Sequence, residues 1–102
     1  MFHVLQKAYA DHGQENQWKQ HHQGGPTGYA NREAVATPDS PLLVRPNQAF
    51  AWNPSIVGIK SEDTVLCTDD GIEVLTAPSE DWPTLVGRFE GKELPRADIL
   101  VR

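Results

Sequence analysis

Two adjacent histidines form one candidate group that could bind a metal or carry a proton. His21 and His22 precede the pair Gly24-Gly25, and glycine lets a backbone approach a ligand closely or adopt a positive φ. Histidine changes charge near neutral pH and is the commonest metal ligand in proteins. Taken alone, the segment is more simply interpreted as a surface histidine pair beside a flexible turn.

Carboxylates stand at both ends of one apolar run. Glu62 and Asp63 precede the run, and Asp69 and Asp70 follow it. Carboxylates bind divalent cations and act as general acids or bases. Both pairs also have ordinary structural interpretations, the first as a solvated strand start and the second as a turn.

Other kinds of site have little support in the sequence. Ser55 and Ser61 have no nearby histidine and aspartate in a recognisable nucleophile arrangement, so a hydrolase triad is not expected. Cys67 lies in the middle of an apolar run and is expected to be a small buried residue rather than a nucleophile. Gly24-Gly25 lacks the lysine and the following helix of a phosphate loop.

These side chains must be positioned by one helix and several strands. Phe2, Leu5 and Tyr9 recur with helical spacing, and Gly13 is a natural helix end. The polar residues 14–23 are predicted to form a loop or a poorly apolar continuation of that helix.

The strongest strand signal is a hairpin. Thr64–Thr68 and Ile72–Thr76 flank Asp69-Asp70-Gly71, and an Asp-Gly turn between β-rich runs marks a hairpin. A third strand is predicted over Gln48–Trp52, with Phe50 and Trp52 on one face. Glu33–Ala36 and Leu42–Val44 are weaker strand candidates, and the pattern as a whole predicts an α+β fold.

Composition excludes several classes of partner. The 102 residues carry 9 basic and 14 acidic side chains, a formal net charge of −5, so binding to nucleic acid is not expected. One cysteine fits a reducing compartment. The chain has neither an apolar run long enough to span a bilayer nor the pattern of a signal peptide. We therefore expect a cytoplasmic protein with no membrane partner.

The order and spacing of these segments are more specific than any one of them. Glu62–Leu66, followed by an acidic-glycine turn and by Glu73–Thr76, resembles the C-terminal half of the pita-bread metallopeptidases. That superfamily includes methionine aminopeptidase, Xaa-Pro aminopeptidase, prolidase and creatinase, and the similarity is greatest to the Xaa-Pro branch. It covers nearly the whole chain, from Phe2 to Arg102. The resemblance implies that residues 1–102 form a single partial domain, a curved antiparallel sheet with one or two helices on its outer face.

The resemblance also implies a set of site residues. His22 corresponds to the metal-binding histidine of the family and Glu62 to its bridging carboxylate ligand. Asn53 occupies the position of another glutamate ligand, and Tyr29 that of a histidine that contacts substrate. The inner face of the sheet is then expected to carry His22, Asn53 and Glu62. The metal that the family binds there is divalent, such as Mn, Co or Zn.

The same comparison predicts a loss of activity. The two aspartate ligands that the family takes from the first half of its domain are absent, and Asn53 offers only a neutral oxygen. We therefore expect a truncated or degenerate Xaa-Pro metallopeptidase-like domain that binds no metal by itself and has no peptidase activity in isolation. Two alternatives remain: a non-catalytic module that binds a peptide or protein in the same groove, or a half-domain whose other half is supplied in trans.

A homodimer is the expected assembly. The halves of the family's domain are related by an approximate twofold axis, and without the first half Phe50, Trp52, Val65 or their neighbours, together with a strand edge, are expected to be exposed. Exposed apolar patches tend to be covered by association, most often with twofold symmetry. His22 and Glu62 of each copy would then line a shared groove.

Overall fold

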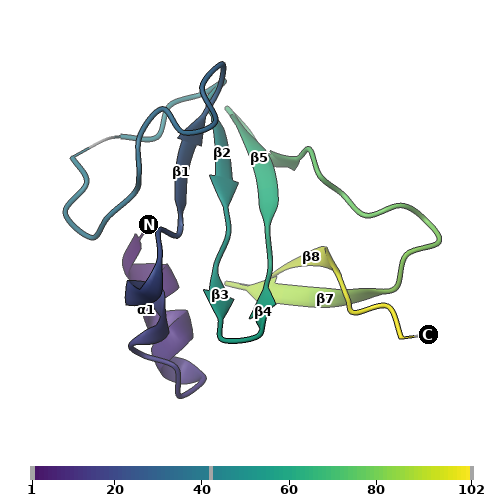
Figure 1. Ribbon diagram of the computed structural model, residues 1–102. Coiled ribbons are helices and arrows are strands. Elements are labelled where there is room, and N and C mark those ends of the chain that lie inside the picture. Colours follow the sequence, from purple (N-terminus) through teal and green to yellow (C-terminus); the bar gives the residue numbers. More distant parts are fainter. Residues whose placement is uncertain (1, 42, 102) are drawn as a thin grey trace.

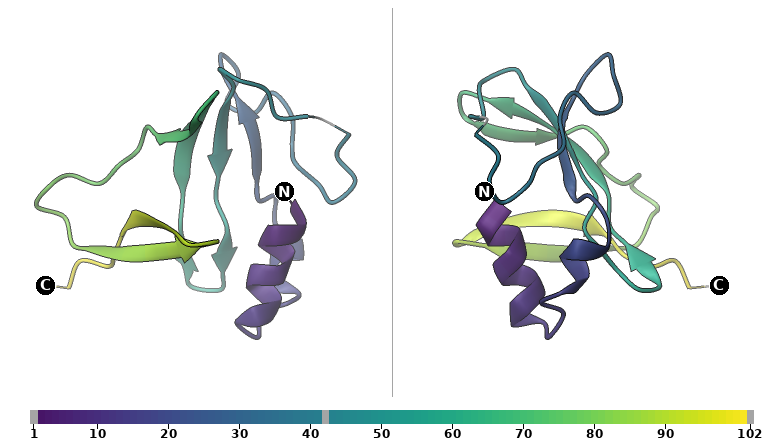
Figure 2. Two further views of the ribbon diagram at one scale, coloured as in Figure 1. Left: turned by 180° about the vertical axis from the view of Figure 1, so that it is seen from behind. Right: turned by 60° about the vertical axis from the view of Figure 1, so that its left-hand side comes forward.

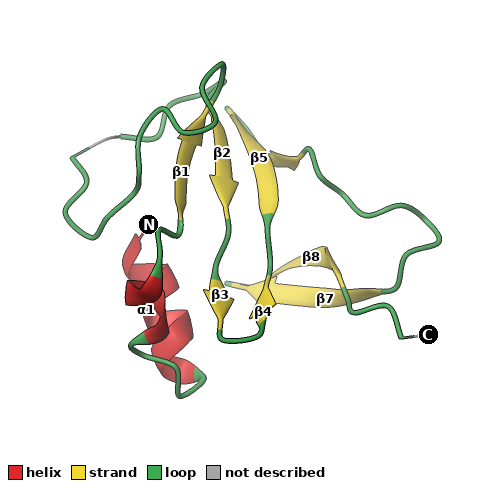
Figure 3. Cartoon of the chain, viewed as in Figure 1, coloured by secondary structure: helices red, strands yellow, loops and turns green. Residues whose placement is uncertain are grey.

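The computed structural model describes residues 2–41 and 43–101 and shows one α-helix, one short 3₁₀-helix and eight strands (Figures 1 and 3). In chain order these are α1 (Phe2–Asp11), η1 (Gln17–Gln20), β1 (Gly24–Thr27), β2 (Ala49–Trp52), β3 (Ser55–Ile56), β4 (Ile59–Lys60), β5 (Asp63–Thr68), β6 (Gly71–Val74), β7 (Thr84–Phe89) and β8 (Lys92–Ala97). The α+β prediction is confirmed, because every strand pairing is antiparallel and α1 precedes all the strands.

A four-stranded sheet in the order β1-β2-β5-β6 forms the centre of the fold. Beyond one end of it, β3 and β4 make a short hairpin that continues the directions of β2 and β5 (Figure 1). The β7–β8 hairpin lies across the same end of the sheet and pairs with no other described strand. The helix α1 lies beside this end as well, as all three views show (Figure 2).

The predicted hairpin is confirmed. In the β5–β6 register Thr68 pairs with Gly71, so Asp69 and Asp70 are the two turn residues. Gly71 has a φ of 141°, a conformation that glycine adopts without steric cost. The second strand ends at Val74, two residues earlier than the sequence pattern suggested.

The prediction of a strand over Glu33–Ala36 is wrong, although the segment lies against the sheet. The Glu33 N–H donates to the Pro26 carbonyl over 3.0 Å, and the Ala36 N–H donates to the Gly24 carbonyl over 2.8 Å. These two bonds are too few for a strand but they cover the outer edge of β1. Leu43 and Val44 are also outside any strand, and Leu42 lies outside the described residues.

The core is small and draws its side chains from α1, β2 and β5. Its buried apolar side chains are Phe2, Tyr9, Phe50, Ala51 and Cys67. The rings of Phe50 and Trp52 are nearly parallel, with centroids 6.2 Å apart, which fits their predicted common face. Burial of Cys67 confirms its predicted role as a core residue.

The expected exposure is wrong for Phe50, Trp52 and Val65 themselves. Phe50 is buried and Trp52 is half-buried, because α1 and the segment after β1 pack near them, and Val65 is half-buried as well. The exposed large apolar side chains of the strands lie on β3, β4, β6 and β7, among them Ile59, Ile72 and Phe89. No helix in the described part of the chain is long and apolar enough to cross a membrane.

Candidate functional site

The ends of three neighbouring strands bring together three of the four predicted site residues. Trp52 pairs with Gly24 on one side and with Asp63 on the other. One step further along, the Asn53 N–H donates to the Gln23 carbonyl over 2.8 Å, and Glu62 directly precedes Asp63. His22 therefore comes just before β1, Asn53 just after β2 and Glu62 just before β5, at the same end of the sheet.

Tyr29 is not part of this group. It follows β1 at the opposite end of that strand from His22, and its side chain is fully exposed. Within this chain it therefore cannot contact a ligand held between His22 and Glu62.

Of the three grouped residues, Glu62 is the one with a carboxylate. Its Oε2 lies 2.7 Å from Nζ of Lys60, and this hydrogen bond lowers the pKa of Glu62 below its ordinary value of 4.5. Partial burial opposes that shift, while the positive charge of Lys60, with smaller effects from Arg32 and His22, adds to it. Glu62 is thus ionised at neutral pH, but a cation would have to compete with Lys60 for its carboxylate.

Asn53 has an unusual environment for an amide. The residue is 7% exposed, and its Oδ1 is buried without a hydrogen-bond partner among the described residues. A buried carbonyl oxygen left unpaired costs about 1–3 kcal/mol. The free Oδ1 is an acceptor that a cation or a donor group could use.

The donor set fits a divalent metal only in part. His22 and Glu62 are suitable ligands, but no third histidine, cysteine, aspartate or glutamate joins them among the described residues. The carboxylate of the neighbouring Asp63 already forms an ion pair with Arg96 and accepts a hydrogen bond from the Thr76 hydroxyl. Tight zinc sites use at least three protein ligands. These residues alone therefore do not complete a metal site, and we derive no metal-dependent step.

Gly24 and Gly25 have a structural explanation. A Cβ atom on Gly24 would overlap the Ala51 carbonyl oxygen, and one on Gly25 would overlap that of Ala34. Both glycines also have positive φ values, 138° and 154°. The pair is required by the close packing of β1 between its neighbours, so it gives no independent support for a ligand at His22.

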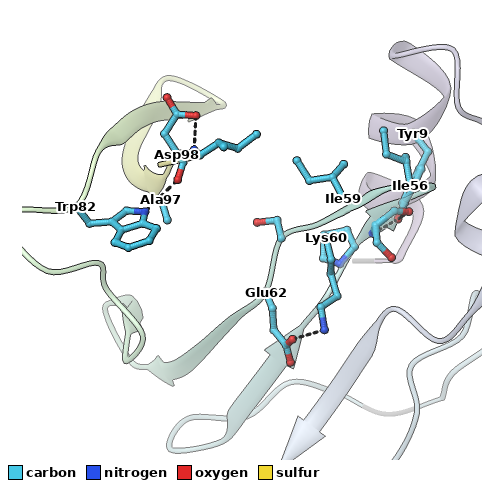
Figure 4. Close-up of a pocket in the computed structure, with 12 residues that line it drawn as sticks. Tyr9, Ile56, Ile59, Lys60, Glu62, Trp82, Ala97 and Asp98 are labelled. Carbon is cyan, nitrogen blue, oxygen red and sulfur yellow. Dashed lines mark hydrogen bonds and ion pairs between the residues drawn. The ribbon is translucent and has the colours of Figure 1, made fainter. Parts of the chain in front are cut away.

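A cavity of about 510 Å³ lies beside Glu62 (Figure 4). Its lining combines apolar side chains with the Lys60–Glu62 pair; these residues include Tyr9, Ile56, Ile59, Lys60, Glu62, Trp82, Asp98 and Ile99. The indole N–H of Trp82 donates to the Asp98 carbonyl over 3.0 Å, which fixes one wall. His22 and Asn53 do not line this cavity. Of the three grouped residues, Glu62 alone therefore lines the cavity as well.

Sequence reasoning missed the polar cluster next to the site. Gln23 is 1% exposed, and its Nε2 donates to the carbonyls of Trp18 and His21, each over 3.0 Å. The Tyr9 hydroxyl lies 2.8 Å from Gln23 Oε1 and accepts the Ser55 N–H over 2.7 Å. Nothing in the sequence separates Gln23 from the other glutamines around it.

The expectation that Ser55 has no histidine nearby is wrong. His21 Nε2 is in hydrogen-bond contact with Ser55 Oγ. Within the described ranges no carboxylate is hydrogen-bonded to His21, so the third member of a catalytic triad is not supplied.

Comparison of the chain with protein-family models, with curated proteins and with solved structures gave no match.

Proposed function

We propose that this chain is a degenerate member of the Xaa-Pro metallopeptidase group, built like the C-terminal half of a pita-bread domain and without peptidase activity in isolation. The observation that carries the proposal is the convergence of His22, Asn53 and Glu62 at one end of β1, β2 and β5. The resemblance to the family assigns ligand roles to the same three positions.

Inactivity follows from the chemistry of these side chains. Two suitable ligands are fewer than a catalytic metal needs, and Asn53 contributes a neutral oxygen instead of a carboxylate. Lys60 further offsets the charge of Glu62. A site that does not retain a divalent cation lacks the group that would supply a hydroxide nucleophile at neutral pH.

The direct test is a peptidase assay with Xaa-Pro peptides in the presence of Mn²⁺, Co²⁺ or Zn²⁺. We expect no turnover. Hydrolysis that disappears in both His22→Ala and Glu62→Ala, while Tyr29→Phe remains active, would show that the site is catalytic and would refute the proposal.

A peptide-binding module is the second candidate, because the cavity beside Glu62 has apolar walls and one charged pair. Such a cavity suits an apolar side chain of an extended peptide. Titration with Xaa-Pro peptides without metal, followed by the fluorescence of Trp82, tests this candidate. The signal should be lost in Trp82→Phe and retained in Trp18→Phe, whose indole does not line the cavity.

We also propose a homodimer, with a basis that differs from the one expected from sequence. Leu85, Val86 and Phe89 on β7 are 48%, 53% and 57% exposed. Leu85 and Phe89 share one face of β7, with Val86 on the other, and exposed apolar side chains grouped on one face are often covered by association. Sedimentation equilibrium should give a dimer that Phe89→Glu dissociates, and a monomer over the micromolar range would refute the proposal.

A further inference from the structure

The two outer edges of the four-stranded sheet differ in how they are protected. At β1, the N–H groups of Glu33 and Ala36 bond the carbonyls of Pro26 and Gly24. At the opposite edge, β6 (Gly71–Val74) is the last strand of the sheet, and no described segment bonds its outer side. An uncovered strand edge is a template for another strand.

Backbone hydrogen bonds show which groups of β6 face outward. The Leu75 N–H donates to the Thr64 carbonyl over 2.9 Å, so the backbone of Leu75 faces β5. Backbone groups of successive residues in a strand alternate in direction. The backbone of Glu73 therefore also faces β5, and the N–H and C=O groups of Ile72 and Val74 face away from it.

The residue opposite Ile72 gives the same result independently. Cys67 donates its N–H to Gln48 and accepts the N–H of Asn47, each over 2.8 Å. Both backbone groups of Cys67 are thus directed away from β6, and the Cys67–Ile72 pair of the register exchanges no hydrogen bonds between its members. Two donors and two acceptors remain available on the outer edge of β6.

The side chains of β6 define what an added strand should carry. Ile72 and Val74 share one face, on which Ile72 is 58% exposed, whereas the exposed Glu73 lies on the other face. Asp69 and Asp70 form the turn next to the strand. In an added strand, every second side chain would lie beside Ile72 and should be apolar. The side chains between them would lie on the face of Glu73.

Charge decides between a basic partner and a second copy of this chain. Residues 61–87 contain seven acidic side chains and no lysine or arginine. In a twofold antiparallel pairing centred on β6, with Ile72 opposite Val74, Glu73 would face Glu73 of the other copy. Like charges directly opposite each other in a sheet are destabilising, whereas opposite charges are stabilising.

We infer that β6 accepts an extended, basic segment of another protein as a fifth strand of the sheet. The backbone groups of Ile72 and Val74 bond this segment, and its lysine or arginine side chains pair with Glu73 and the adjacent turn. Main-chain bonds supply affinity and the alternate side chains supply selectivity in this mode of recognition. The inference does not depend on the proposed role of His22 and Glu62.

The test uses two short synthetic peptides, one of alternating valine and lysine and one of alternating valine and glutamate. The lysine peptide should bind the whole chain and slow amide hydrogen exchange at Ile72 and Val74 while leaving Glu33 and Ala36 unchanged. The glutamate peptide should bind more weakly, by about two- to fivefold for each charged pair formed. Equal binding of both peptides, or no binding of either, would overturn the inference.

Two variants separate the edge from its charge. Proline is tolerated where an edge N–H faces outward, so Ile72→Pro should keep the sheet and abolish binding, whereas Ile72→Val should bind normally. Glu73→Lys should reverse the preference between the two peptides. Binding that survives in a folded Ile72→Pro protein would refute the inference. Protection of Ile72 and Val74 in the free protein that increases with its concentration would identify a second copy as the occupant and also refute it.

Discussion

The attachment of the β7–β8 hairpin depends on one half-buried ion pair, and this makes it a sharp target for mutation. The guanidinium of Arg96 pairs with Oδ2 of Asp63 and donates to Ser61 Oγ over 2.9 Å. Oδ1 of Asp63 accepts the Thr76 hydroxyl over 2.6 Å. Because β7 and β8 pair only with each other among the described strands, these side-chain contacts fix the hairpin to β5.

The expected loss of stability follows from how deeply the Arg96 and Asp63 side chains are buried. The Arg96 and Asp63 side chains are 29% and 17% exposed. Removing one partner of a fully buried pair costs about 3–5 kcal/mol, and an exposed pair contributes about 0–1 kcal/mol. We therefore expect Asp63→Ala and Arg96→Ala each to lower the free energy of unfolding by about 2–3 kcal/mol, with a coupling of about 1–2 kcal/mol between them.

A double-mutant cycle by urea denaturation measures the coupling, and the chain offers a matched control. Arg88 and Glu93 form another arginine–carboxylate pair at 2.9 Å, but their side chains are 74% and 60% exposed. Their coupling should stay below about 0.5 kcal/mol and disappear in high salt. Equal couplings for the two pairs would refute the argument from burial.

Four further predictions concern the site. Tyr9→Phe should lower the free energy of unfolding by about 1–2 kcal/mol, because it leaves buried groups of Gln23 and Ser55 unpaired, which denaturant titration would detect. Gly24→Ala should destabilise more than Gly13→Ala in thermal melts, since only Gly24 faces a backbone clash. Asn53→Glu should be less stable than Asn53→Gln at neutral pH and should recover with Co²⁺, as calorimetry would show, because a buried carboxylate needs a positive partner. The Lys60–Glu62 pair lowers the pKa of Glu62, so its small contribution should be complete above pH 4.5 and be lost as pH falls below that value, measured as the difference between wild type and Glu62→Gln.

Sequence patterns predicted the helix and the main hairpin, because residues close together in the chain determine both. The spacing of Phe2 and Tyr9 identified the helix, and the Asp69-Asp70-Gly71 turn fixed the main hairpin and its register. The placement of Glu33–Ala36 was not predictable in the same way. Its two bonds to β1 depend on where the following loop crosses the sheet, which is a tertiary property without a local pattern.

The grouping of His22, Asn53 and Glu62 was expected only from the family resemblance, since the residue patterns predicted no strand over Gly24–Thr27. His22, Asn53 and Glu62 adjoin paired strands, so the register brings them to one end of the sheet. Tyr29 follows β1 and is carried to the other end by the strand itself. The contacts of Gln23 and of Ser55 with His21 arise from the path of η1 and β3 past each other. No periodic pattern in the sequence predicts that η1 and β3 come into contact.

Asn53 is the residue whose environment is hardest to explain by folding alone. An apolar side chain at a position 7% exposed would avoid the cost of an unpaired amide oxygen, whereas Asn53 retains that cost. Gln23, which is also buried and accepts the Asn53 N–H with its backbone carbonyl, has partners for both its amide nitrogen and its amide oxygen. Two neighbouring buried amides thus differ in one respect: Gln23 is saturated by its own chain, and Asn53 has a free acceptor at the strand end that also adjoins Glu62. This contrast makes Asn53, and not Gln23, the amide whose environment the fold does not explain.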